Sequence, residues 1–250
     1  MRKLLSIMCA VLFMVCASAP AASYWSGGNS GLWGDVQTWG GGGYPVAGDY
    51  VYVNVGSTIT IVGTAEAALE LHQASWSGNS DPVTLDISNA GSLITSGVAH
   101  IGVAGGDVGI VELDGTSIFT TNGALNVGYN GNGTLNTYGT VNANSGLYVS
   151  NPWAAGSGTL NIYDGTVNAS EFAMSGTGLV NIEAGELRIY GLWYDATLTA
   201  LIGADQIVAY SGAETVVLSH DGDYTVLTAT PEPATMLILA LGGLLIRRKK

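Results

Sequence analysis

The sequence predicts an all-β fold: a single-stranded parallel β-helix, or β-solenoid, with three short strands in each coil. Between Gly109 and Tyr190 the chain repeats itself, and each repeat opens with glycine, a short alternating strand, a second glycine and a second strand. Most repeats add a third strand. Equivalent apolar positions recur roughly every 20 to 25 residues, a period typical of stacked coils. These positions are Val111, Leu135, Leu160 and Val180.

Alternation within each strand predicts which side chains point inward. In the strand that contains Asn161, for example, Leu160 and Ile162 should face the interior and Asn161 the solvent. No coil can bury its apolar residues alone, but stacked coils form one column in which each aliphatic side chain contributes about 1.5–3 kcal/mol. The expected inward residues are Leu85, Ile87, Leu93, Val111, Leu113, Leu125, Val127, Leu135, Thr137, Val141, Leu147, Val149, Leu160, Ile162, Val167, Phe172, Met174, Val180, Ile182 and Leu187.

Glycines at the predicted corners, Gly115, Gly139, Gly165 and Gly185, are expected to adopt positive φ where the chain turns sharply. The alternative fold, an antiparallel sandwich, would need strands of about five or six residues. It would also give no reason for one register across all repeats.

Residues 1–22 read as a secretory signal peptide: a positive start, an apolar run from Leu4 to Val15, and small residues before the mature chain. We therefore expect export from a bacterial cytoplasm. Both cysteines, Cys9 and Cys16, lie in this leader without a convincing lipobox, so the mature protein has no disulfide or cysteine metal site.

Residues 23–63 are predicted to form an N-terminal cap and the first strands. Trp25, Trp33 and Trp39 precede the first coil and suit a cover for the open end of the solenoid. The alternative is a sugar-stacking platform, because flat aromatic rings lie well on pyranose faces.

Residues 64–190 form the coils, and Leu69 and Leu71 are expected to face inward in the first of them. Residues 191–229 lose the repeat and are predicted to cap the far end. Two alternating runs around Asp221-Gly222 predict a β-hairpin there.

The charge distribution excludes nucleic acid as a partner. Six of the seven basic residues lie at the termini, so Arg188 is the single cation of the long stretch between them. One cation against 19 acidic residues leaves about 18 net negative charges. Such a surface repels phosphate backbones, which require clustered Lys and Arg.

Catalysis is not expected, and no cofactor is predicted. Asp86 and Glu112 occupy equivalent outward positions on adjacent coils, about 5 Å apart, and are interpreted as a solvated pair or a weak Ca²⁺ site. The next coils carry Asn136, Asn161 and Asn181 at that position, which predicts a ladder of hydrogen-bonded asparagines. A lyase acting on acidic sugars would need a cationic base, for which Arg188 is the only candidate.

The remaining candidates for a binding site are the histidines and a Thr-x-Asn pattern. The three histidines, His72, His100 and His220, are assigned to unrelated coils, so a zinc site is not expected. Thr-x-Asn recurs on two coils and should make flat polar rows that serve as ladders. Glycan docking and ice binding are the alternatives for these rows. Their residues are Thr134, Asn136, Thr140, Asn142, Thr159, Asn161, Thr166 and Asn168.

Residues 230–250 combine Pro231-Glu232-Pro233, an apolar run of about 13 residues and the basic end Arg247-Arg248-Lys249-Lys250. This apolar run, about 20 Å long as a short hydrophobic helix, falls short of the roughly 30 Å of a bilayer core. The combination resembles the PEP-CTERM sorting signal of Gram-negative bacteria. The resemblance implies an exosortase-type enzyme as partner, transient contact with the inner membrane, cleavage near Pro231–Pro233 and release toward the cell surface or outside.

The Trp-rich opening and the glycine-punctuated repeats are similar to autotransporter-associated repeats and related secreted β-helix proteins. Together these features predict a non-enzymatic structural or adhesive protein of the cell surface or exopolysaccharide matrix. A carbohydrate-active β-helix enzyme and a glycan- or ice-binding module are the alternatives.

Overall fold

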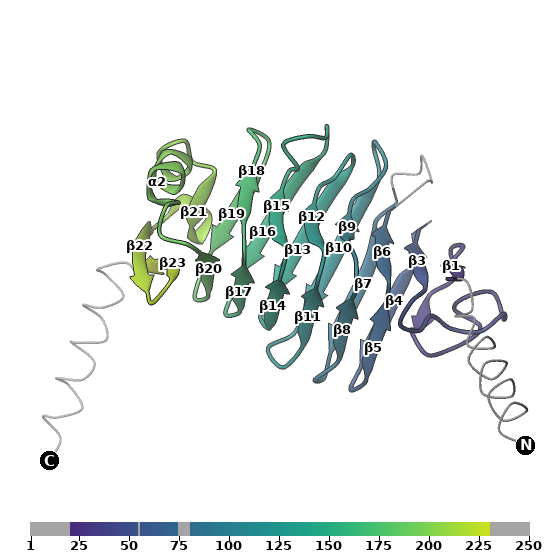
Figure 1. Cartoon of the computed structure of the whole chain (residues 1–250). Helices are drawn as coiled ribbons and strands as arrows, with labels where there is room; N and C mark the ends of the chain where they lie inside the picture. Colours follow the sequence, from purple (N-terminus) through teal and green to yellow (C-terminus); the bar gives the residue numbers. More distant parts are fainter. Residues whose placement is uncertain (1–20, 55, 75–80, 231–250) are drawn as a thin grey trace, which may run out of the picture.

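The computed structural model describes residues 21–54, 56–74 and 81–230, and it is a β-solenoid of about seven turns (Figure 1). Nearly all of the predicted signal peptide and the tail from Pro231 onward, with its predicted short helix, lie outside these residues. Within the described residues, no helix is long and apolar enough to cross a membrane.

Three sheets form the walls of the solenoid, as the sequence predicts. Within each coil the chain visits sheet A, then B, then C, and strands of successive coils pair in parallel. Sheet A contains β1 (Ser23–Trp25), β3 (Tyr50–Val53), β6 (Glu70–Gln73), β9 (Ala99–Ile101), β12 (Ala124–Val127), β15 (Gly146–Val149) and β18 (Phe172–Met174). Sheet B contains β2 (Gly31–Leu32), β4 (Thr58–Val62), β7 (Val83–Ser88), β10 (Val108–Leu113), β13 (Asn132–Thr137), β16 (Ser157–Ile162), β19 (Leu179–Ile182) and β21 (Ile207–Ala209). Sheet C contains β5 (Ala65–Ala68), β8 (Ser92–Thr95), β11 (Ile118–Thr121), β14 (Thr140–Ala143), β17 (Thr166–Ala169), β20 (Glu186–Tyr190), β23 (Tyr224–Thr230) and β22 (Thr215–Asp221).

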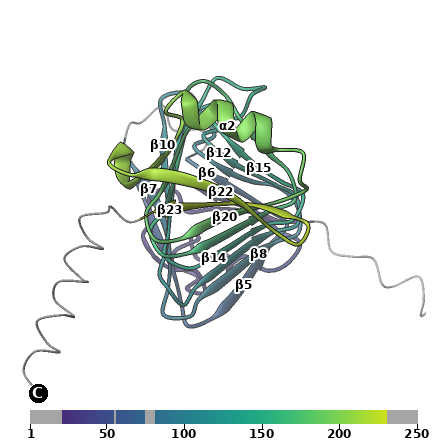
Figure 2. The ribbon, with the colours of Figure 1, turned by 90° about the vertical axis from the view of Figure 1, so that its left-hand side faces the viewer.

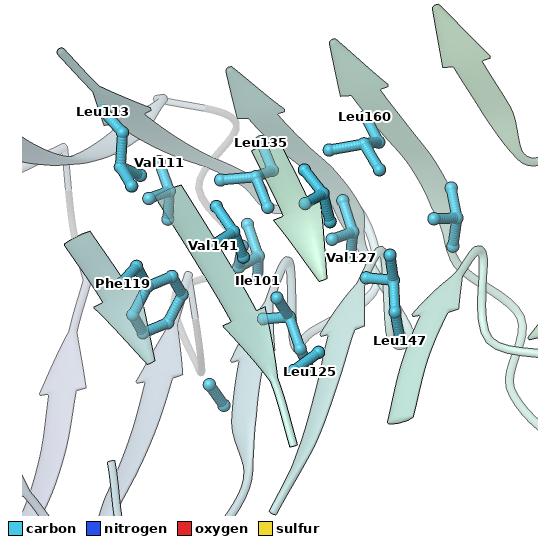
Figure 3. Close-up of a cluster of buried hydrophobic side chains, with 14 of the residues drawn as sticks. Ile101, Val111, Leu113, Phe119, Leu125, Val127, Leu135, Val141, Leu147 and Leu160 are labelled. Carbon is cyan, nitrogen blue, oxygen red and sulfur yellow. The ribbon is translucent and has the colours of Figure 1, made fainter. Parts of the chain in front are cut away.

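The interior is the column that the alternation predicts (Figure 3). Val111, Leu135, Leu160 and Val180 pair in register along sheet B, and none of them is exposed to solvent. Nineteen of the 20 expected inward residues are buried, Met174 being the one that is half-buried. In the first coil the prediction is wrong for Leu69, which is half-buried, because the neighbouring Ala68 takes the interior position.

The corner glycines have a different role from the one expected. Gly139 and Gly165 do not adopt positive φ. They are required because adjacent coils approach closely: a Cβ on Gly139 would collide with the carbonyl oxygens of Asp114 and Ser117, and one on Gly165 with the carbonyl oxygen of Gly139. Of the other two, Gly115 has ordinary space around it and Gly185 is crowded by Gly165, and neither has positive φ.

Positive φ is found instead at the corner between sheets A and B. Gly102 has φ 73° and Gly128 has φ 76°, in the left-handed region that favours glycine. These turns recur at the same corner of adjacent coils, immediately after β9 and β12.

Trp33 and Trp39 lie at the N-terminal end of the column, 1% and 6% exposed. The indole nitrogen of Trp33 donates to the carbonyl of Pro45 at 3.3 Å, and that of Trp39 donates to the carbonyl of Trp33 at 2.6 Å. Because each indole N–H has a hydrogen-bond acceptor, the two large rings are buried without leaving a polar donor unpaired. Trp25, by contrast, is 41% exposed.

The C-terminal end contains an element that the repeat does not predict, the helix α2 (Asp195–Gly203), whose Leu198 is fully buried against the last coil (Figure 2). The expected hairpin is present as β22 and β23, with β23 pairing antiparallel to β20. Its two-residue turn is Gly222-Asp223, one residue later than expected, because Asp221 still pairs with Tyr224.

Candidate functional site

A polar row runs along the outer face of sheet B. Asp86, Glu112, Asn136, Asn161 and Asn181 occupy the same register position on successive coils, so Asp86 and Glu112 are neighbours. Their alternation with buried residues directs the first four toward solvent, as expected.

Hydrogen bonds between coils join the middle of this row. The amide of Asn161 donates to Asn136 Oδ1 at 2.7 Å, and that of Asn136 donates to Glu112 Oε1 at 2.7 Å. The prediction of an outward position is wrong for Asn181, which is 5% exposed because the C-terminal cap covers it, and it accepts from the backbone N–H of Ser211 at 2.8 Å. Because a carboxylate only accepts hydrogen bonds, Glu112 forms the natural end of a ladder whose amides all donate in one direction.

A second row follows the outer face of sheet C. The Asn168 amide donates to Asn142 Oδ1 at 3.0 Å, and the Asn142 amide donates to Thr120 Oγ1 at 3.2 Å. Arg188 is the next residue in register after Asn168. The two rows therefore engage all four asparagines of the Thr-x-Asn pattern in contacts between coils.

Arg188 holds the terminal hairpin to the last coil. Its guanidinium donates to Asp221 at 2.7 Å and to Glu186 at 3.4 Å, and it lies 5.0 Å from the centre of the Tyr224 ring. The hydrogen bond that Arg188 donates to Asp221 is the main cause that raises the pKa of Arg188. The lone cation of the body is thus engaged with the protein's own carboxylates.

The predicted threonines form rows only two coils long. Thr134 pairs with Thr159 on sheet B and Thr140 with Thr166 on sheet C, and all four are half-buried. Ile110 and Leu179 flank the first pair in register. These apolar neighbours limit the flat polar surface to two coils.

Sheet A carries a feature that the sequence prediction missed, a column of aromatic and imidazole rings on its outer face. Trp25 stacks on Tyr52 with ring centres 4.1 Å apart, and Tyr52 stacks on His72 at 5.0 Å. His72 lies 5.2 Å from His100, which lies 4.4 Å from Tyr129. The interpretation of the histidines as unrelated is wrong for this pair, because His72 and His100 are register partners on adjacent coils.

In this ring column, defined by Trp25, Tyr52, His72, His100 and Tyr129, the three inner rings have a ring neighbour on each side, whereas Trp25 at its N-terminal end is 41% exposed. Stacked rings cover one another's faces and present edges to solvent, whereas a pyranose packs on a free face. The signal that would have revealed most of the column is one outward register position of sheet A, which holds Trp25, Tyr52, His72 and His100 on successive coils. Tyr129 follows β12 and reaches His100 from the next corner of the chain. Two exposed tryptophans outside the column, Trp153 and Trp193, are 76% and 70% exposed and were also not singled out.

His100 has the most perturbed environment in the column. Burial, and second the neighbouring His72, lower its pKa to about 4, and its Nδ1 is buried with no hydrogen-bond partner. His72 hydrogen-bonds Glu70 at 3.0 Å. Among the described residues, no three His, Cys, Asp or Glu side chains are arranged to hold a metal ion.

We predict that acid destabilises the fold through His100. Between pH 6.5 and pH 4 the unfolded chain binds a proton at this residue and the folded chain does not. The free energy of unfolding therefore decreases as the pH is lowered through this range, by up to about 3 kcal/mol. His100→Phe, which keeps a ring between His72 and Tyr129, should remove most of this loss in urea unfolding measured across that range.

The matched control is His220→Gln, which removes a largely exposed histidine whose Nε2 contacts Asp195. This variant should keep the wild-type acid loss. An unchanged pH slope in His100→Phe would contradict the assignment. The window stops at pH 4 because the hydrogen bond from Ser117 lowers the pKa of Asp114 to about 2, which gives a separate loss at lower pH.

A hollow with a volume of about 520 Å³ lies at the N-terminal end. Leu32, Trp33, Val36 and Val62 give it an apolar lining, and Asp35 and Glu66 are its only ionisable residues.

Comparison with known proteins identifies the tail. A family model described as the PEP-CTERM protein-sorting motif matches residues 229–250. No curated protein and no solved structure matches the chain. The match includes both predicted signal elements, Pro231–Pro233 and Arg247–Lys250, which lie outside the described residues. The chain therefore joins a β-solenoid to a PEP-CTERM motif, the recognition signal of exosortase, which marks proteins exported to the cell surface or extracellular space.

Proposed function

We propose that this exported, exosortase-processed β-solenoid is a non-enzymatic structural and adhesive protein of the cell surface or exopolysaccharide matrix. The observation that carries the proposal is the pair of ladders, in which Asn136, Asn161, Asn142 and Asn168 bond to the neighbouring coil. Polar groups used in this way stiffen a rod and lose their freedom to bind a substrate.

The arrangement of carboxylates favours this role over catalysis. A glycosidase needs one carboxyl group as acid and another as base or nucleophile on opposite sides of a bound sugar. Asp86 and Glu112 instead lie side by side on one flat face, and Glu112 accepts the Asn136 amide at 2.7 Å. The acidic body further disfavours anionic polymers, so the matrix component to which it adheres should be a neutral polysaccharide.

Trp153 supports the adhesive part of the proposal. It is 76% exposed and contacts Tyr148 edge to face, with ring centres 5.3 Å apart. This exposure is high enough for the indole to pack on a sugar ring, as an aromatic side chain with one apolar surface in water can do.

We predict that the exported protein, incubated with the exopolysaccharide of its own producing cell, cosediments with it and releases no reducing sugar. The double variant Asp86→Asn/Glu112→Gln should behave like wild type, whereas Trp153→Ala should bind more weakly. The matched control is Trp193→Ala, which removes a tryptophan of similar exposure (70%) between β20 and α2.

Sugar release by the wild type that disappears in the double variant would overturn the proposal in favour of a carbohydrate-active enzyme. Failure to cosediment with any polysaccharide tested would remove the adhesive role.

A further inference from the structure

Sheet C has two unpaired edges, one at each end of the solenoid (Figure 1). It begins at β5 and ends at β22, and every strand between them pairs on both sides. The carbonyls of Thr64 and Ala68 accept from Ser92 and Ser96 on the next coil. Because backbone groups alternate in direction along a strand, the N–H and C=O of Ala65 and Ala67 face away from that coil.

The edge at β5 is open because the N-terminal turn is incomplete. The strands β1 and β2 extend sheets A and B beyond the first full coil, but residues 33–49 add no strand to sheet C. In the described part of the chain, no strand pairs with the outer side of β5.

Apolar surface surrounds this open edge. The N-terminal hollow, to which Glu66 of β5 contributes, is lined by Leu32, Val36 and Val62, which are 55%, 38% and 39% exposed. On the outer face, Ile94 is 44% exposed and pairs in register with Ala67. An open strand edge beside exposed aliphatic side chains is a site at which a further strand can add.

The opposite end supplies such a strand. Among the described strands, the seven-residue β22 has β23 as its sheet neighbour, and Glu214 just before it bridges to Ala209. The middle residues of β22, Val217 and Leu218, are half-buried and uncharged. It runs antiparallel to β23, which is itself antiparallel to β20, and it lies across the end of the solenoid (Figure 2).

We propose that this protein associates head to tail, the β22 edge of one copy adding to the β5 edge of the next. The occupant is a second copy because each chain presents both halves of the joint, in the same sheet and at opposite ends. Such a contact is heterologous, so it extends into an open filament instead of closing as a dimer. The inference goes beyond the proposed structural role and does not depend on it, since a monomeric solenoid could still be adhesive.

Charge at the two ends makes the association dependent on salt. Asp35 and Glu66 lie at the β5 end, and Asp223 lies at the β22 end, where Arg188 compensates the neighbouring Asp221. Like charges brought together by the joint repel one another, and added salt screens this repulsion. Association should therefore strengthen as ionic strength rises.

The test is sedimentation velocity of the exported protein over a range of concentration and salt. We expect the average mass of the wild type to rise with both. Ala67→Pro should weaken association about tenfold or more, because it removes an N–H that points away from β8. Proline is tolerated in an edge strand, so the hydrogen bonds between β5 and β8 stay in place. Ala65→Glu, which adds charge at the exposed edge, provides a second variant that leaves the backbone unchanged. Ala155→Glu, on a lateral loop, adds the same charge elsewhere and should associate like wild type.

Mixing distinguishes a filament from a closed dimer. Ala67→Pro still presents its β22 edge, so small amounts added to wild type should terminate growing filaments and lower the average mass. A wild type that stays monomeric at high concentration and salt would overturn the proposal. So would association unaffected by both edge variants, or a proline variant that leaves wild-type assembly unchanged in the mixture.

Discussion

Leu160→Asp is expected to destabilise the protein by at least about 4 kcal/mol, because it removes a buried aliphatic side chain and places a carboxyl group in an apolar column. Leu160 is not exposed to solvent and pairs in register with Leu135 and Val180 on the adjacent coils. In that column no described donor replaces the water that the carboxylate would lose.

The control lies one residue away on the same strand. Asn161→Asp removes one amide donated to Asn136 and places two oxygens against each other, on a half-buried outer face. This loss should be about 1 kcal/mol. Equal losses for the two variants in urea unfolding would contradict the inside and outside assignment. Because Leu160→Asp risks complete unfolding, Leu160→Ala, with an expected loss of about 2–5 kcal/mol, keeps the comparison measurable.

The second large effect concerns processing at the sorting motif. Replacing Pro231-Glu232-Pro233 by three alanines should abolish cleavage, since it removes part of the matched sorting motif and replaces residues that disfavour helix by alanine, which favours it. Export should continue, because the predicted signal peptide directs it. We therefore expect the uncleaved variant to accumulate at the inner membrane.

The measurement is mass spectrometry of the surface fraction together with the membrane fraction. The wild-type surface protein should end near Pro233, and the variant should retain Arg247–Lys250 in the membrane fraction. As a control, Thr228→Ala just upstream in β23 should be processed normally. Recovery of Arg247–Lys250 on surface-located wild-type protein would refute cleavage and make the tail an anchor.

The sequence by itself determined the features that depend on local chemistry. Alternation along strands such as that of Leu160, Asn161 and Ile162 indicates the inward face without knowledge of any neighbour, and the structure confirms it. The period of the repeat predicts stacked coils in the same way. The tail was also identified locally, because a sorting motif is recognised as a short contiguous segment.

Tertiary structure decided every feature that depends on which coil faces which. Tyr52 and His72 are 20 residues apart and His72 and His100 are 28 apart, yet each pair stacks because loops of unequal length restore the register. For the same reason the need for Gly139 and Gly165 is visible only when the carbonyls of the preceding coil are in place.

The two ends of the solenoid were likewise set by tertiary contacts. No apolar periodicity in the sequence predicts helix α2, because Leu198 is its one buried residue. The helix forms where it packs against the last coil. The open edge at β5 exists because residues 33–49 bury Trp33 and Trp39 instead of forming a third strand. A repeat encodes its own coil through local alternation, whereas a terminus has one neighbouring coil only, so its structure depends on how that single exposed face is covered.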